Sequence, residues 1–160
     1  MKIIKIYADG GARGNPGPAA IGYSIIQNGQ EIKAHGQYIG KATNNQAEYK
    51  AVLAALIWLE ENADFISENK RNSNGNSSLE EIQVFLDSLL VAKQLSGQYK
   101  IKNKILQNIA IKVKKLEQDL IKEGKVKKIS YHHIPREQNK RADFLLNEAL
   151  DKHLFANPKA

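Results

Sequence analysis

The fold is decided by the stretch IIKIYADGGARGNPGPAA, which occupies residues 3–20. In its first part, apolar residues such as Ile4 and Ile6 alternate with residues of the opposite face, which is the pattern of a half-buried strand. The glycines and prolines that follow favour a turn. The stretch therefore predicts a strand over residues 2–8 that delivers Asp9 at its end, and a turn after it.

Two more strands are predicted directly after this turn, over residues 19–27 and 31–39. Asn28 and Gly29 between them suit the positive φ angles of a tight hairpin turn. Consecutive strands joined by such short turns predict an antiparallel meander.

The rest of the chain alternates between helical and strand patterns. Apolar residues spaced three and four apart predict helices over about 45–62, 89–95, 105–120 and 142–150. Short apolar runs predict strands over 82–86 and 126–132. This order predicts an α/β fold with a five-stranded mixed sheet, three antiparallel strands followed by two parallel ones, flanked by about four helices.

Composition narrows the class of protein. The chain has 160 residues, 42% of them hydrophobic, so we expect one globular domain over residues 1–155, with an exposed polar loop at 67–78 and a short tail at 156–160. The lack of cysteine excludes a disulfide scaffold and thiolate metal sites, and it fits a reducing compartment. The first residues have no long apolar core of a signal peptide. We therefore expect a monomeric, cytoplasmic protein without membrane attachment.

Positive charge indicates the class of partner. The net charge is +7, and ten lysines lie between residues 100 and 128. Lysines neutralise phosphates and release their counterions, so the excess favours a polyanionic partner such as a nucleic acid. A solvated, lysine-rich helix face would look the same, and charge alone leaves both interpretations open.

Four acidic residues are predicted at strand ends or near helix starts: Asp9, Glu48, Asp87 and Asp143. Asp9 and Asp87 follow strands, whose ends meet at one edge of a sheet, where α/β proteins bind ligands. Clustered carboxylates repel one another unless a hard cation such as Mg²⁺ binds them, and two such ions can promote phosphodiester hydrolysis. Taken singly, Glu48 and Asp143 are better explained as a helix cap or a surface charge.

Four motifs occur in order along the chain: YADGGARGNPGPAA at 7–20, TNNQAE at 43–48, LDS at 86–88 and PREQNKRAD at 135–143. Together they resemble the motifs of type 1 ribonucleases H, especially the compact variety of archaea and some bacteria that lacks a separate basic protrusion. The resemblance covers about residues 3–150. It implies the ribonuclease H fold and an endonuclease that hydrolyses the RNA strand of RNA/DNA hybrids, leaving 5′-phosphate and 3′-hydroxyl ends.

The resemblance also implies a metal site. Asp9, Glu48, Asp87 and Asp143 match the family's catalytic, metal-binding acids. In the family these acids hold two Mg²⁺ ions when substrate is bound, with Mn²⁺ as a substitute. Any one motif is weak evidence, whereas four in the right order are specific.

Contacts to the nucleic acid are implied at two places. Asn15, Asn44 and Asn45 match family positions that contact the hybrid, and an amide can both donate to and accept from a 2′-hydroxyl or a base edge. The segment from residue 95 to 104 is too short for the basic protrusion of other relatives. We expect exposed lysines to replace it in binding phosphates: Lys100, Lys102 and Lys104.

His133 is a candidate for proton transfer. It lies six residues before Asn139, the spacing at which the family often carries a histidine thought to assist catalysis or product release. Its neighbour His132 makes the choice less definite, and a histidine at a strand end is as often a plain surface residue.

Two alternatives to hybrid cleavage stay open at this level. Double-stranded RNA shares the A-form shape and 2′-hydroxyls of the hybrid and is a second candidate substrate. A ribonuclease H-like module that binds nucleic acid without cutting it is the other, although such modules usually lack one of the acids.

Overall fold

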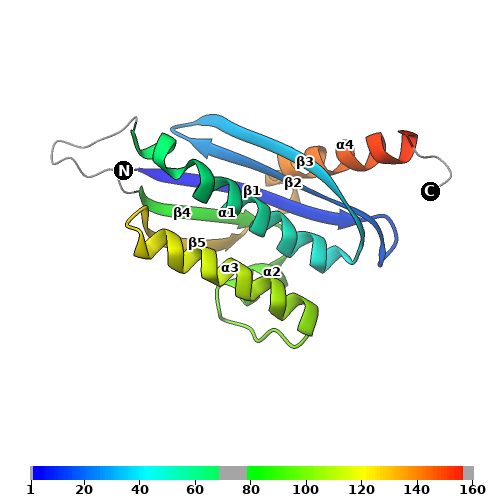
Figure 1. Cartoon of the computed structure of the whole chain (residues 1–160). Coiled ribbons are helices and arrows are strands. Elements are labelled where there is room, and N and C mark those ends of the chain that lie inside the picture. Colours follow the sequence, from blue (N-terminus) through cyan, green and yellow to red (C-terminus); the bar gives the residue numbers. More distant parts are fainter. Residues whose placement is uncertain (1, 69–78, 157–160) are drawn as a thin grey trace.

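The computed structural model describes residues 2–68 and 79–156. Within them, five strands form one sheet in the order β3-β2-β1-β4-β5 (Figure 1). The strands are β1 (Ile3–Ala12), β2 (Gly17–Gln27), β3 (Gln30–Ala42), β4 (Leu79–Leu86) and β5 (Val126–His133). β2 is antiparallel to both β1 and β3, whereas β4 is parallel to β1 and to β5. The predicted mixed sheet is confirmed.

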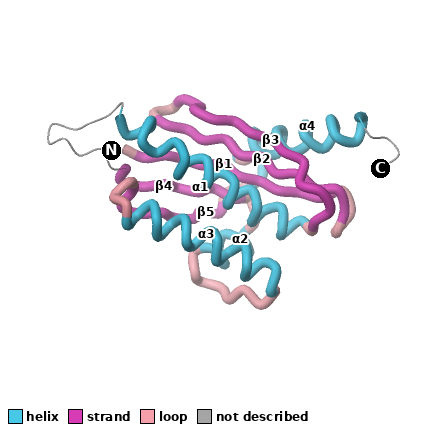
Figure 2. The backbone as a smooth tube through the Cα atoms, viewed as in Figure 1, coloured by secondary structure: helices cyan, strands magenta, loops and turns pink. Residues whose placement is uncertain are grey.

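Helices cover both faces of this sheet. They are α1 (Asn44–Glu68), α2 (Leu89–Leu95), α3 (Lys104–Lys122) and α4 (Lys140–Ala156), with a 3₁₀ turn at Arg136–Gln138. Figure 2 shows α1 and α3 side by side across one face, and α4 packs against β2 and β3. None of the helices in the described ranges combines the length and apolarity needed to span a membrane.

Alternation along β2 sends its side chains into two layers. Ile21 and Ile25 belong to the main core beneath α1, whereas Ala20 packs with Leu146 of α4. Successive strand residues point to opposite faces of a sheet, so α4 lies on the face opposite α1. The site is therefore supplied from both sides of the sheet.

Two helices are longer than predicted. α1 continues to Glu68 instead of ending near residue 62, because residues 63–68 contain no Gly or Pro to stop it. The start of the predicted loop is thus helical, and its residues 69–78 lie outside the described residues. α4 likewise continues to Ala156, which removes that residue from the predicted tail, while residues 157–160 also lie outside them.

β1 is also longer than predicted, and this changes the place of Asp9. The strand continues to Ala12 because residues 8–12 pair with β2, and Asp9 lies opposite Gly22 within that pairing. Pairing with β4 stops earlier, at Tyr7. Asp9 therefore lies inside β1, just beyond the point at which its parallel neighbour ends.

Candidate active site

Three of the predicted acids come together at this point of the sheet. Asp9 on β1, Glu48 on α1 and Asp87 after β4 each offer a carboxylate oxygen, and these oxygens lie within 4.8 Å of one another. Asp9 and Glu48 are buried, and Asp87 is half-buried. Residues far apart in the chain thus form one cluster of carboxylates.

A glycine brings α1 close enough to β1 to form this cluster. A Cβ atom at Gly10 would lie 2.1 Å from the carbonyl carbon of Ala47 and 2.4 Å from the amide nitrogen of Glu48. No larger residue fits there without moving the helix backbone. Because α1 begins at Asn44, Glu48 lies one turn into the helix, directly against β1.

The fourth acid, Asp143, reaches the same place from the opposite face. Asp143 lies in the first turn of α4 and lines, with the other three acids, a cavity of about 310 Å³. Glycines again allow a close approach, since a Cβ at Gly22 would lie 2.3 Å from the carbonyl oxygen of Ala142. The cavity is thus lined by all four acids that the motifs identified.

Burial and mutual repulsion disfavour the ionised form of the carboxyls in this cluster. Burial, followed by the charge of Asp87, raises the pKa of Asp9 to about 7. Burial and the charges of Asp9 and Asp87 raise the pKa of Glu48 well above its usual value. Glu48 Oε2 is buried without a hydrogen-bond partner among the described residues. Carboxylates held in this way have oxygens available for a hard cation, so the donor set fits Mg²⁺ or Mn²⁺.

Asn139 joins two sides of the cluster and was not predicted as a site residue. It is 1% exposed, and its Nδ2 donates to the carbonyl oxygen of Ala8 at 2.9 Å and to Asp87 Oδ2 at 3.4 Å. The amide thereby holds Asp87 next to Ala8 of β1. The only sequence signal was its presence in the fourth motif, because the Ala8 contact spans 131 residues.

Two arginines line the acid cavity, Arg13 from the β1–β2 turn and Arg136 from the 3₁₀ turn. The positive charge of Arg136 lowers the pKa of Glu48, although burial and the neighbouring acids outweigh it. Neither arginine was predicted. His133 is exposed at the end of β5, paired with Leu86, and is not among the residues that line the cavity. Its role in proton transfer stays a prediction, and Arg13 and Arg136 are the basic groups that line the cavity of the acids.

The three predicted asparagines lie together in a second, neighbouring cavity of about 440 Å³. Asn15 Oδ1 accepts a hydrogen bond from the amide of Asn44 at 3.0 Å, and Asn44 Oδ1 accepts one from the amide of Ala12 at 2.8 Å. Asn103, which caps α3, lines the same cavity and was not predicted. These bonds tie the β1–β2 turn to the start of α1 beside the acids.

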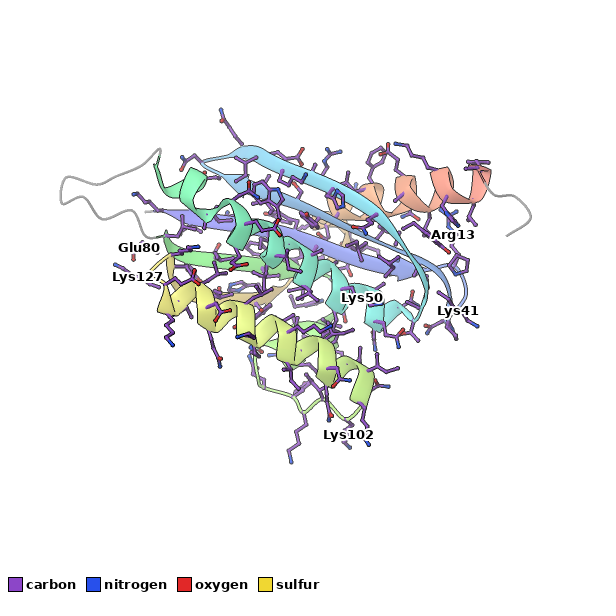
Figure 3. All side chains as sticks on the ribbon, in the orientation of Figure 1. Arg13, Lys41, Lys50, Glu80, Lys102 and Lys127 are labelled. Atoms are coloured by element: carbon purple, nitrogen blue, oxygen red, sulfur yellow. The ribbon has the colours of Figure 1, made fainter. Side chains whose placement is uncertain are left out.

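The predicted lysines lie in and after the loop that joins α2 to α3. Lys100, Lys102 and Lys104 are all exposed, and Asn103 between them reaches the cavity of the asparagines. Figure 3 shows Lys102 projecting outward from this loop, and Arg13 and Lys41 near the end of the sheet where β1 terminates. Positive charge therefore flanks both cavities.

Comparison with known proteins identifies relatives over nearly the whole chain. The ribonuclease H family model matches residues 1–151. Ribonuclease HI of Halobacterium salinarum is 39% identical over 149 residues, which cover 92% of this chain and 64% of that protein. A bifunctional protein of Mycobacterium tuberculosis is 33% identical over 153 residues, which cover 94% of this chain and 36% of it. The chain thus spans about two thirds or less of the length of these relatives.

Solved structures agree with these matches. LC11-RNase H1, isolated from compost by a metagenomic approach, superposes with a TM-score of 0.80 at 39% identity, covering 96% of this chain and 99% of that one. The same protein has been crystallised in complex with an RNA/DNA hybrid, and that structure matches with a TM-score of 0.78 over 94% of this chain and 99% of that one.

Proposed function

Because the chain belongs to the ribonuclease H family, we propose that it is a metal-dependent endonuclease that hydrolyses the RNA strand of RNA/DNA hybrids. The observation that carries this proposal is the cavity lined by Asp9, Glu48, Asp87 and Asp143, three of which have carboxylate oxygens within 4.8 Å of one another. A similar protein binds an RNA/DNA hybrid in a crystal structure. A complete acid set argues against a module that only binds nucleic acid.

The four acids would hold the metal. Their oxygens are the ligands that Mg²⁺ and Mn²⁺ prefer, and there is no thiol in the chain to select a softer ion. Two ions bound together with the substrate, as the family resemblance implies, would activate the attacking water and stabilise the leaving oxygen of the phosphodiester. The chain's own task is positioning: Asn139 fixes Asp87, and the approach of α1 at Gly10 fixes Glu48.

The neighbouring cavity would hold the strand that is cut. This cavity is lined by Asn15, Asn44 and Asn45. Their amides can recognise 2′-hydroxyls or base edges of a strand bound beside the acids. The side chain of Asn44 has its oxygen engaged by Ala12, so its nitrogen is the group left to donate. The exposed lysines 100, 102 and 104 would bind phosphates further along the duplex.

Cleavage assays test the proposal directly. We expect the purified chain to cut the RNA strand of an end-labelled hybrid when Mg²⁺ or Mn²⁺ is added, to leave 5′-phosphate and 3′-hydroxyl ends, and to be inactive in EDTA. Asp9→Asn should abolish cleavage but keep hybrid binding, because it removes a metal ligand and not a phosphate contact. Asp119→Asn, which removes an acid on the surface of α3, is the matched control and should keep activity.

The same assay separates the alternatives. Cleavage of labelled double-stranded RNA at a rate equal to that of the hybrid would broaden the substrate class to A-form duplexes. Metal-independent binding with no cleavage of either duplex would contradict the proposal and indicate a non-catalytic module. We further propose one catalytic domain over residues 1–155 that acts as a monomer in the cytoplasm, and gel filtration with light scattering tests the monomer.

A further inference from the structure

Asp143 differs from the other three acids in how it is held. Asp9 and Glu48 are buried at the contact of β1 with α1, and Asp87 is held by Asn139. Asp143 is exposed on the first turn of α4. An exposed aspartate samples several rotamers unless a neighbour fixes it. Precise ligation by Asp143 therefore requires a partner for its carboxylate.

The partner lies one helical turn further along α4. Asn147 Nδ2 donates to Asp143 Oδ1 at 3.1 Å and to the carbonyl oxygen of Asp143 at 2.9 Å. Residues four apart on a helix face the same side, so the contact forms on the side of α4 that lines the cavity. The bond occupies one lone pair of Oδ1 and restrains the carboxylate whose oxygens would coordinate a cation.

Arg13 fixes the orientation of this amide. Arg13 Nη2 donates to Asn147 Oδ1 at 3.4 Å and forms an ion pair with Asp151 Oδ1 at 2.7 Å. A guanidinium can only donate, so it requires the amide oxygen, and the amide nitrogen must then face Asp143. Arg13 belongs to the same turn as Asn15, which lines the neighbouring cavity. The turn and the fourth acid are therefore connected through one amide.

We propose that Asn147, oriented by Arg13, is a positioning residue that presents Asp143 to the metal, an inference that rests on the proposed function. Asn147 lines the acid cavity itself, which distinguishes it from a residue that merely ties α4 to the turn. Hydrogen-bond partners of metal ligands typically account for about 10–100-fold in metal affinity or activity. Loss of the Asn147 amide should therefore weaken the metal site while the fold persists.

The test compares Asn147→Ala with Asn147→Gln. Alanine removes the donor and is a good helix former, so the variant should stay folded. We expect Asn147→Ala to lower kcat about tenfold and to raise the half-saturating Mg²⁺ concentration by a similar factor, with KM for the hybrid changed less than about twofold. Asn147→Gln keeps an amide and should restore part of the loss. Calorimetric titration of the substrate-free protein with Mn²⁺ should show the same order of affinities.

Two control variants separate positioning from simple tethering. Glu148→Gln removes a charge on the same helix turn. Glu148 forms an ion pair with Lys152 and is not among the residues that line the cavity, so kcat and Mn²⁺ affinity should stay at wild-type values. Asp151→Asn breaks the ion pair of Arg13 but leaves the amide on Asp143. A tether would make Asp151→Asn as harmful as Asn147→Ala, and that result would overturn the proposal.

Failure of this inference can be distinguished from failure of the proposed function. A wild-type chain that cuts the hybrid with Mg²⁺, together with Asn147→Ala that matches it in kcat and Mn²⁺ affinity, would reject the role of Asn147 alone. A wild-type chain with no metal-dependent cleavage would reject the proposed function instead. A fall in kcat without any change in Mn²⁺ affinity or Mg²⁺ requirement would also reject the positioning role.

Discussion

Replacing Asp9 by Asn should make the metal-free protein more stable, by an amount that depends on pH. Asp9 is 7% exposed, and burial and the charge of Asp87 raise its pKa from the usual 3.8 to about 7. In the unfolded chain the carboxyl ionises near its usual value. Between these two pKa values the folded state binds more protons than the unfolded state, so the stability of the wild type falls as the pH rises through this range.

The size of the effect follows from the shift. About three pKa units correspond to about 4 kcal/mol at 1.36 kcal/mol per unit, and this is a ceiling because Asp9 and Glu48 share the effect. Well below pH 4 the carboxyl is protonated in both states and the penalty is absent, whereas well above pH 7 the penalty is complete. The asparagine side chain of the variant is neutral throughout. Asp9→Asn should therefore match the wild type near pH 4 and exceed it by about 2–4 kcal/mol at pH 8.

Urea unfolding in EDTA, followed by far-ultraviolet circular dichroism at pH 4, 6 and 8, measures this difference. For a domain of this size, the stability difference expected at pH 8 corresponds to a Tm that is roughly 5–15 °C higher for Asp9→Asn than for the wild type. Asp119→Asn is the control, because the Asp119 carboxylate pairs with Lys115 on the surface. The stability of this variant should equal that of the wild type at each pH. A gain for Asp9→Asn that is equal at pH 4 and pH 8 would refute the reasoning, because it would not come from ionisation.

Further predictions concern the arginine at the cavity, the approach of α4 and the basic loop. Arg136→Ala should lower kcat about tenfold with little change in stability, since Arg136 is exposed but lines the acid cavity, and steady-state kinetics with Arg136→Lys as partial rescue measure this. Gly22→Ala should destabilise the fold by about 2 kcal/mol or more in urea, because its Cβ would lie 2.3 Å from the Ala142 carbonyl oxygen, and a wild-type midpoint would contradict the packing. Joint replacement of Lys100, Lys102 and Lys104 by Ala should weaken hybrid binding and make log Kd less dependent on the logarithm of the salt concentration. An unchanged slope would show that these lysines do not bind phosphates.

Local patterns predicted the elements of this fold better than their ends. The alternation of apolar residues in β1 and their helical spacing in α1 arise because one face of each element packs against the core. Such packing gives a periodic pattern of apolar residues in the sequence. The ends depend on pairing and packing elsewhere. β1 continues to Ala12 only because β2 pairs with it, and β4 begins at Leu79, which pairs with Val126, before its apolar run starts. Neither partner can be identified from the segment itself.

The same limit applies to the site. Asp9 and Asp87 were supported by a strand pattern that leads to each of them, whereas Glu48 and Asp143 depended more on the resemblance. No such pattern marks Asn139 or Asn147. Asn139 matters through its contact with Ala8 of β1, and Asn147 through its contact with Asp143, whose own role was inferred from the resemblance. His133 was selected because its spacing matches a histidine of the resembled family, and its role stays a prediction. Spacing along the chain could not show that Arg13 and Arg136 line the cavity.

The way the acids are held explains why the cluster should need its metal. Asp9 and Glu48 are both buried, next to the close approach of β1 and α1 at Gly10. Without a cation, protonation relieves first the cost of burying charged carboxylates and then their mutual repulsion, and the pKa values of both carboxyls are raised for these two reasons. Binding of a divalent ion must therefore displace protons, and metal affinity should increase as the pH rises toward and past 7.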